Sequence, residues 1–345
     1  MSDESAALFL VAPDLAGPPT GGTRYNAELL GALGEVGVSA VRIGLDEARV
    51  AVRGGSRGRF LLDSLYLDEL PALRSLGGEG ARIFALVHYL PSLVRAALRG
   101  GDSRRDREAW RVETEAVAAA SGFVVPSELL RGELERRGAR PETILVLEPG
   151  IAVRPALEAP SLDRVRALLV GSLVEGKGVL GLFEALAREL SAGDRFELCV
   201  VGSERAEPEY AQACRRAARE TQALRGRVTF DGELAPREVR TRLHESNLFV
   251  SASLTESYGM ALAEARAAGV PIVAREGGNV SAHVEPESGG ELAPDDQGVA
   301  RACVALSRNA GEHARRLTAA RSWAHRARTV SWIEVARGVT AWILA

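Results

Sequence analysis

The chain contains 345 residues with a mass of 36.7 kDa, which is more than one hydrophobic core usually holds and predicts two domains. Apolar residues make up 46% of the chain and charged residues 26%, and this balance excludes a disordered or fibrous protein. The net charge of −3 and the pI near 6.1 exclude a strong positive field, so we expect no nucleic-acid partner.

Short apolar runs alternate with helical stretches along the whole chain. In the first half the runs read "ALFLVAP", "RIFALVHYL", "GFVVPS" and "TILVLEPG", and in the second half "RALLVGS", "FELCVVGS", "RVTFDG", "NLFVSAS" and "VPIVARE". Runs that are apolar throughout, without alternating polar residues, are typical of parallel strands buried on both faces. The sequence therefore predicts two α/β units in series.

Prolines interrupt an irregular stretch at residues 151–163, where we place the boundary between the two units. We therefore expect an N-terminal domain over residues 1–160 and a C-terminal domain over residues 161–345. The last segment, "SWIEVARGVTAWILA", has apolar residues at helical spacing. It predicts a terminal helix that packs back across the domains.

The chain has three cysteines, Cys199, Cys214 and Cys303, which form neither a CxxC pair nor a metal-ligand spacing. We expect reduced, buried thiols in a cytoplasmic protein. The N-terminal stretch "MSDESAALFLVAPD" has acidic residues before a short apolar run, whereas a signal peptide carries positive charge before a longer one. No window approaches the roughly 18 apolar residues of a transmembrane segment, so we expect none.

Two glutamates, Glu256 and Glu264, lie between two predicted strands in "TESYGMALAEARAAGVPIVA". The Ala and Leu content predicts a helix that ends at Gly269, with Glu256 before it and Glu264 inside it. Ligands of open parallel sheets bind beyond the carboxyl ends of the strands, and a helix start built from small residues suits a phosphate. Glu264 would then reach a ribose. The alternative is that Glu256 caps the helix and Glu264 faces water.

Three stretches together resemble one enzyme family. The stretches "GPPTGGTRYNAELLGAL", "VGSLVEGKGVLGLFEAL" and "LFVSASLTESYGMALAEARAAGVPIVA" are similar, in order and spacing, to retaining glycosyltransferases of the GT-B fold, close to glycosyltransferase family 4. The resemblance implies two Rossmann-like domains that face a central cleft. It also implies transfer of a sugar from a nucleotide-diphosphate sugar to an acceptor hydroxyl, with retention of configuration. We expect neither a metal nor another cofactor, because no DxD-like acidic metal clamp stands in a suitable loop.

The resemblance assigns roles to residues in the second half of the chain. Glu256 would hold hydroxyls of the donor sugar and Glu264 the ribose, while Lys177 in "EGKG" would hold phosphate. Backbone groups would line the diphosphate and the sugar at Ser257, Tyr258, Gly259 and Met260. The family usually carries an arginine where this chain has Ser172, so a second cation on the diphosphate is missing there. Arg24 or Arg275 is a candidate to replace it.

In the first half, Gly21 and Gly22 match the glycine loop through which the family's N-terminal domain approaches the donor phosphates. Glycine lets a backbone come close to a ligand, although a plain turn would have the same composition. His88 ends a predicted strand where the family carries a histidine that contacts the sugar. Without the resemblance, a structural histidine is the alternative. The other four histidines have no such support.

Two further segments allow a functional and a structural interpretation. Residues 276–290 are rich in glycine and turn formers, and the resemblance places them near the donor, although many loops at strand ends have no function. Six arginines lie between residues 95 and 111, where they would contact an acceptor or the surface of a membrane. Interleaved acidic residues favour a solvated face instead.

Two other functions remain open from the sequence. Doubly wound sheets also occur in nucleotide-dependent oxidoreductases, but neither glycine-rich stretch has the GxGxxG spacing after a strand. A non-catalytic partner or sensor that binds a nucleotide sugar would keep the same fold. The sequence names neither the donor sugar and its base nor the acceptor, and it leaves the oligomeric state open.

Overall fold

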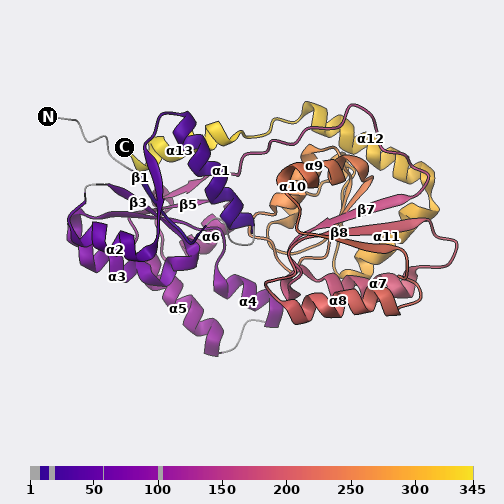
Figure 1. The fold of residues 1–345 in the computed structure, drawn as a ribbon, viewed down its shortest axis with the longest axis horizontal. Helices are drawn as coiled ribbons and strands as arrows, with labels where there is room; N and C mark the ends of the chain where they lie inside the picture. The colour runs from indigo at the N-terminus through magenta and orange to yellow at the C-terminus, as the bar shows by residue number, and fades with distance from the viewer. Residues whose placement is uncertain (1–7, 15–19, 57, 100–103, 345) are drawn as a thin grey trace. The chain divides into compact units, whose positions relative to one another are not determined.

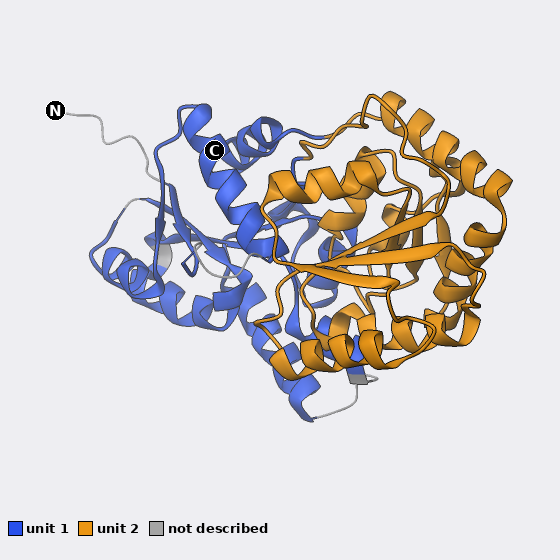
Figure 2. Ribbon diagram, turned by 45° about the vertical axis from the view of Figure 1, so that its right-hand side comes forward, with its two compact units in different colours: residues 1–150, 330–345 blue, residues 151–329 orange. Residues whose placement is uncertain are grey.

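The computed structural model describes residues 8–14, 20–56, 58–99 and 104–344. The chain forms two compact units, unit 1 from residues 1–150 and 330–345 and unit 2 from residues 151–329 (Figure 2). From the sequence we place the boundary at residue 160 and assign the terminal helix to the second domain. The structure instead divides the chain after Gly150 and returns the terminal helix to unit 1.

Unit 1 contains a six-stranded parallel sheet in the order β2-β1-β3-β4-β5-β6. Figure 1 labels β1, β3 and β5 of this sheet. Its strands are β1 Leu8–Val11, β2 Ala40–Ile43, β3 Arg59–Asp63, β4 Arg82–Leu86, β5 Gly122–Val125 and β6 Ile144–Val146. Its helices are α1 Gly21–Glu35, α2 Leu45–Arg53, α3 Leu70–Gly77, α4 Pro91–Arg99, α5 Arg104–Ala119, α6 Glu128–Arg136 and α13 Trp332–Ile343, with short helices η1 Ser64–Glu69, η2 Gly78–Gly80 and η3 Pro141–Thr143.

Both faces of this sheet are buried, which explains the apolar runs in the sequence. On one face the strands pack with α1 and α13, and on the other with α2, α3, α5 and α6. The terminal helix α13 belongs to unit 1 because its apolar side buries Val335, Ala336, Val339 and Ile343 in the same cluster as Tyr25 of α1. Helical spacing predicts such an apolar side but does not tell which partner covers it.

Unit 2 contains a second six-stranded parallel sheet, in the order β12-β11-β10-β7-β8-β9. Its strands are β7 Val165–Val170, β8 Phe196–Val201, β9 Val228–Gly232, β10 Leu248–Ser251, β11 Ile272–Arg275 and β12 Glu291–Ala293. Its helices are α7 Val179–Glu189, α8 Pro208–Glu220, α9 Pro236–Glu245, α10 Met260–Ala267, α11 Asp296–Arg308 and α12 Ala310–Arg326, with short helices η4 Glu175–Lys177, η5 Val280–Ala282 and η6 Pro286–Ser288.

The α/β class and the two parallel Rossmann-like sheets confirm the prediction, and each of the nine apolar runs contains a strand. The prediction omits β2, β3 and β12. These strands are short, and charged residues occur within or at the ends of all three, so their apolar pattern is weak. Among the described residues, no helix is both long and apolar enough to span a bilayer.

Candidate active site

The centre of the second sheet brings Lys177 and Glu256 together. Strands β7 and β10 are neighbours, and the chain leaves them toward opposite edges of the sheet, which is the kind of switch point where such sheets bind ligands. Lys177 ends the short helix η4 after β7, and Glu256 follows β10. The Nζ atom of Lys177 donates a hydrogen bond to Oε1 of Glu256 at 2.5 Å. The two side chains are 29% and 16% exposed, so both still reach solvent.

Glycines shape the turn that carries Lys177. Gly178 adopts a φ of +65°, and a Cβ added there would collide with the carbonyl oxygen of Ala252. The stem of Lys177 lies against Gly171, where an added Cβ would be 3.4 Å from both Cδ and Cε. The backbone N–H of Leu254 donates to the carbonyl of Gly176 at 2.9 Å, which ties this turn to the segment after β10. The turn therefore fits a long, slender side chain with its charge at the tip.

Helix α10 starts a few residues after Glu256. Gly259 adopts a φ of +95° at the N-cap, and α10 begins at Met260. Glu264 is the fifth residue of this helix and only 4% exposed. The alternative in which Glu264 faces water is therefore wrong, and a carboxylate so deeply buried needs polar or charged partners.

The segment after β11 holds the backbone between Glu256 and Gly259. The N–H of Asn279 donates to the carbonyl of Glu256 at 2.7 Å, and its side-chain Nδ2 donates to the carbonyl of Tyr258 at 2.9 Å. Nε2 of His283 lies 2.6 Å from the same Tyr258 oxygen. Because a carbonyl oxygen only accepts, Nε2 of His283 carries a proton. Burial lowers the pKa of His283 to about 4, so this ring is neutral at pH 7.

In unit 1, Gly21 and Gly22 form the first turn of α1. The helix begins here because Thr20 and Thr23 cap it reciprocally, with the N–H of each donating to the hydroxyl of the other. A Cβ added at Gly22 would lie 3.0 Å from Cδ2 of His88, so the structure brings these two predicted residues into contact. The earlier part of the glycine stretch, residues 17–19, lies outside the described residues.

His88 follows β4 and joins a buried polar network. Its Nε2 lies 2.9 Å from Oδ1 of Asn26 and 3.5 Å from Oδ2 of Asp63. Nδ2 of Asn26 donates to Oδ2 of Asp63 at 2.5 Å, and the N–H of Leu65 donates to Oδ1 of Asp63 at 2.7 Å. Burial lowers the pKa of His88, while the charge of Asp63 opposes this effect. Among the hydrogen bonds of the described residues, none involves Nδ1 of His88.

Sequence reasoning missed three of these residues. Asn26 is a polar residue on the apolar side of α1, Asp63 directly follows the buried run of β3, and His283 has no motif. A search for polar residues at apolar positions would have found Asn26. Asp63 is the last residue of β3, a strand that the sequence pattern does not predict, so a search of predicted strand ends would not have found it.

The structure also bears on the two arginines proposed to replace the one missing at Ser172, and on the basic stretch between residues 95 and 111. Nη1 of Arg275 donates to Asp296 at 3.1 Å, so Arg275 already has an acidic partner, while Arg24 stays a prediction. Within the basic stretch, Arg111 pairs with Glu108 and Glu115 on its own helix, which favours the solvated face. Residues 100–103 of this stretch lie outside the described residues.

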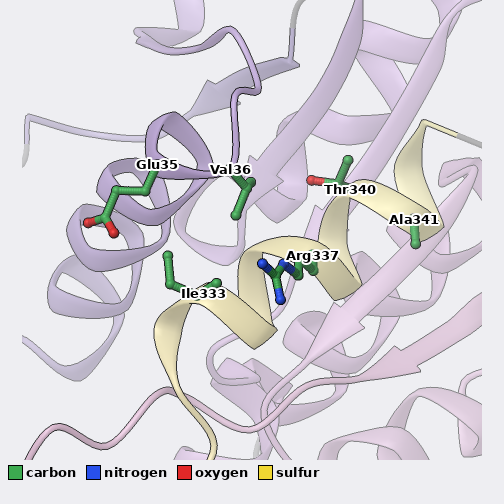
Figure 3. Close-up of a pocket in the computed structure, with 6 residues that line it drawn as sticks. All are labelled: Glu35, Val36, Ile333, Arg337, Thr340 and Ala341. Atoms are coloured by element: carbon green, nitrogen blue, oxygen red, sulfur yellow. The ribbon is translucent and has the colours of Figure 1, made fainter.

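A surface pocket of about 650 Å³ lies elsewhere in unit 1, between the end of α1 and α13 (Figure 3). It is lined by Glu35, Val36, Ile333, Arg337, Thr340 and Ala341. None of the predicted site residues lines it, so it is separate from the candidate site. No group of three or more His, Cys, Asp or Glu side chains in the described part of the chain is arranged to hold a metal ion.

Solved structures identify the fold. Sucrose-phosphate synthase of Thermosynechococcus elongatus superposes with a TM-score of 0.77 at 18% identity, covering 97% of this chain and 98% of that one. Anabaena Alr3699/HepE in complex with UDP and glucose superposes with a TM-score of 0.75 at 16% identity, covering 99% of this chain and 100% of that one. The protein therefore has the fold of GT-B proteins.

Sequence comparisons find similar proteins for part of the chain. Residues 164–309 match the family described as Glycosyl transferases group 1. A D-inositol 3-phosphate glycosyltransferase of Streptomyces bingchenggensis is 27% identical over 60% of this chain, and the amylovoran biosynthesis glycosyltransferase AmsK of Erwinia amylovora is 29% identical over 54%. These matches cover 49% and 47% of the two relatives, so the chain spans about half their length. Most of unit 2 is thus similar to group 1 glycosyl transferases, in agreement with the family resemblance of the sequence motifs.

Proposed function

We propose that the protein transfers a sugar from a nucleoside-diphosphate sugar to an acceptor hydroxyl. The observation that carries this proposal is the pair of Lys177 and Glu256 at the switch point of the second sheet, next to the start of α10. A cation, a carboxylate and a helix N-terminus within one site suit a ligand that has both phosphates and hydroxyls. The names of the relatives support sugar transfer, and the UDP-glucose complex of the similarly folded Anabaena Alr3699/HepE supports this class of donor.

In this proposal the donor lies across the start of α10. The ammonium of Lys177 and the backbone groups from Ser257 to Met260 bind the diphosphate. The buried carboxylate of Glu264 lies about one and a half turns into the helix and accepts hydrogen bonds from the ribose hydroxyls. Glu256, which keeps part of its surface exposed, accepts from hydroxyls of the sugar.

The chemistry requires a stabilised leaving group. The bond between the sugar's anomeric carbon and the phosphate oxygen breaks, the acceptor oxygen bonds to that carbon, and the acceptor proton passes to the departing phosphate. Negative charge builds up on the diphosphate during this step, and Lys177 with the helix N–H groups stabilises it without reorganising. The acceptor oxygen attacks the anomeric carbon from the same face that the diphosphate leaves, so the sugar retains its anomeric configuration. We propose that no metal ion takes part.

His88 would contribute from unit 1. Its Nε2 is engaged by Asn26 and Asp63, which fixes the orientation of the imidazole and leaves Nδ1 as the ring nitrogen for a sugar hydroxyl. Because burial keeps this ring neutral, Nδ1 would accept a hydrogen bond there. Gly22 contacts the same ring, so its lack of a side chain keeps that site open.

The test is a thermal-shift screen of UDP-, GDP-, ADP- and dTDP-sugars, followed by an assay for release of the nucleoside diphosphate in excess EDTA. A donor at about 100 times its Kd should add roughly 2.7 kcal/mol to the free energy of unfolding. We expect stabilisation by one base and turnover that EDTA leaves intact. If no nucleotide or nucleotide sugar stabilises the protein, the proposal is wrong. If the protein binds a nucleotide sugar but does not turn it over in the presence of acceptor candidates, it is a nucleotide-sugar binding protein and not an enzyme.

A further inference from the structure

Asn279 and His283 hold two carbonyl groups of the segment that leads into α10. The backbone N–H of Asn279 donates to the carbonyl of Glu256, and the side chains of Asn279 and His283 both donate to the carbonyl of Tyr258. A β-bridge between Glu256 and Gly278 joins the same two segments. The segment before α10 is therefore bound through its carbonyl oxygens to residues 278–283.

This arrangement fixes the direction of two N–H groups. In a trans peptide unit, the C=O and the following N–H point in opposite directions. Holding the carbonyl of Glu256 therefore directs the N–H of Ser257 away from residues 278–283, and holding the carbonyl of Tyr258 does the same for the N–H of Gly259. The positive φ of Gly259 allows the chain to enter α10 from this orientation.

The surroundings of His283 indicate that this position needs the hydrogen bond donated by Nε2, and not only a ring that packs well. The ring is 3% exposed, packs edge-on against Tyr258 with 4.7 Å between ring centroids, and contacts Gly259. Its Nδ1 is buried and has no hydrogen-bond partner within the described structure. An apolar ring would pack in this place without burying an unpaired nitrogen, so the imidazole costs stability that its Nε2–H bond must offset.

We propose that Asn279 and His283 are positioning residues, whose side chains aim the N–H of Gly259 at the diphosphate of the donor, while the backbone N–H of Asn279 does the same for the N–H of Ser257. This inference rests on the proposed function, because it supposes a diphosphate at the start of α10. Neither residue touches the ligand. Each acts by holding a carbonyl, so that the N–H groups meet the phosphate already aligned and no ordering is needed on binding.

His313 provides a matched control in the same unit. Its ring is 2% exposed, and its Nε2 lies 2.9 Å from the carbonyl oxygen of Asn247. Burial lowers the pKa of this histidine as well. Asn247 immediately precedes β10, whereas Glu256 follows it. The bond of His313 therefore lies at the amino end of β10, opposite to the carboxyl end that leads to Glu256. Replacing His313 by Phe removes the same kind of bond without affecting the start of α10.

The experiment compares binding of nucleoside diphosphates with binding of the bare nucleosides by calorimetry. The probes are UDP, GDP and ADP with uridine, guanosine and adenosine, and the variants are His283→Phe, Asn279→Leu and His313→Phe. We expect His283→Phe and Asn279→Leu to weaken binding of the preferred nucleoside diphosphate about tenfold, because hydrogen bonds to its charged oxygens are misaligned. Their affinity for the nucleoside should stay at the wild-type value. His313→Phe should lower the melting temperature and leave both affinities unchanged.

The outcomes separate this inference from the proposed function. If the wild-type protein binds none of the three nucleoside diphosphates, the proposed function fails and this inference fails with it. If the wild type binds one and both His283→Phe and Asn279→Leu bind it equally well, only the positioning role is overturned. An equal loss in His313→Phe would also overturn it, because the effect would then be a general loss of packing. His283→Gln, which offers an amide N–H, should recover part of the diphosphate affinity.

Discussion

Replacing Lys177 by Arg should impair sugar transfer although it keeps the charge. Lys177 is the single lysine among the 43 basic residues of the chain, so a strong preference for arginine everywhere else has not extended to this position. Its stem lies along Gly171, and it sits between Gly176 and Gly178. An arginine would carry a wider, planar group to the place where Nζ now lies 2.5 Å from Glu256.

The magnitude follows from what the ammonium does. A hydrogen bond to a charged phosphate contributes about 1.5 to 3 kcal/mol, and a guanidinium in this narrow turn should keep the attraction but lose the short contact. We expect Lys177→Arg to lose about 1.4 kcal/mol of transition-state stabilisation, which is a tenfold fall in rate. Lys177→Ala should lose more, because it also leaves the carboxylate of Glu256 next to the phosphates without its cation.

The assay is the initial rate of transfer over a range of donor concentrations up to saturation, which gives kcat and KM separately. Arg188→Lys is the control, because it exchanges the two cations on an exposed side chain of α7 in the same unit. If Lys177→Arg transfers sugar at the wild-type rate, the reasoning from the narrow turn and the single lysine is refuted. Lys177 would then be a position that only needs positive charge.

Three further predictions test other parts of the site. Glu264→Ala should weaken binding of the nucleoside diphosphate by roughly 1.5 to 3 kcal/mol, because the ribose hydroxyls lose a charged acceptor, and an unchanged Kd in calorimetry would contradict the ribose assignment. Gly22→Ala should lower turnover much more than nucleoside-diphosphate binding, because its Cβ would press on the ring of His88; a wild-type rate would remove both residues from the site. The free energy of unfolding should fall by about 3 kcal/mol between pH 7 and pH 4 through His283 alone, since its pKa is about 4 when folded and about 6.5 when unfolded, and the unfolded chain therefore binds more protons in that range. Urea titrations should find this loss absent in His283→Phe, and an unchanged pH dependence in that variant would contradict it.

The sequence predicts those parts of the fold that depend on local pattern. Strands such as β5 and β8 are apolar over nearly their whole length, and the pattern finds them. The strand β2 contains Arg42 and is only half-buried, so its own composition does not indicate a strand. Its pairing with β1 shows that it is one. The family motifs also predict that Lys177 and Glu256 belong to one site, and the two side chains are in contact although they lie 79 positions apart.

Other parts of the site depend on contacts that no local pattern contains. Asn26 and Asp63 become partners of His88 only because α1 crosses the carboxyl ends of β3 and β4. His283 lies in a loop with no periodicity, and its contact with the carbonyl of Tyr258 depends on how that loop folds back. The sequence shows that these residues are polar, but the three-dimensional fold decides which of them meet.

The return of α13 to unit 1 has a consequence for biosynthesis. Unit 2 is continuous, so it can fold as soon as residues 151–329 have left the ribosome, whereas unit 1 must wait for residues 330–345. This reverses the usual order, in which the N-terminal domain folds first during translation. The ring of Trp332 packs against Tyr25, and Tyr25 packs against His88. A nascent chain that stops before Trp332 therefore lacks the ring that packs on Tyr25 behind His88.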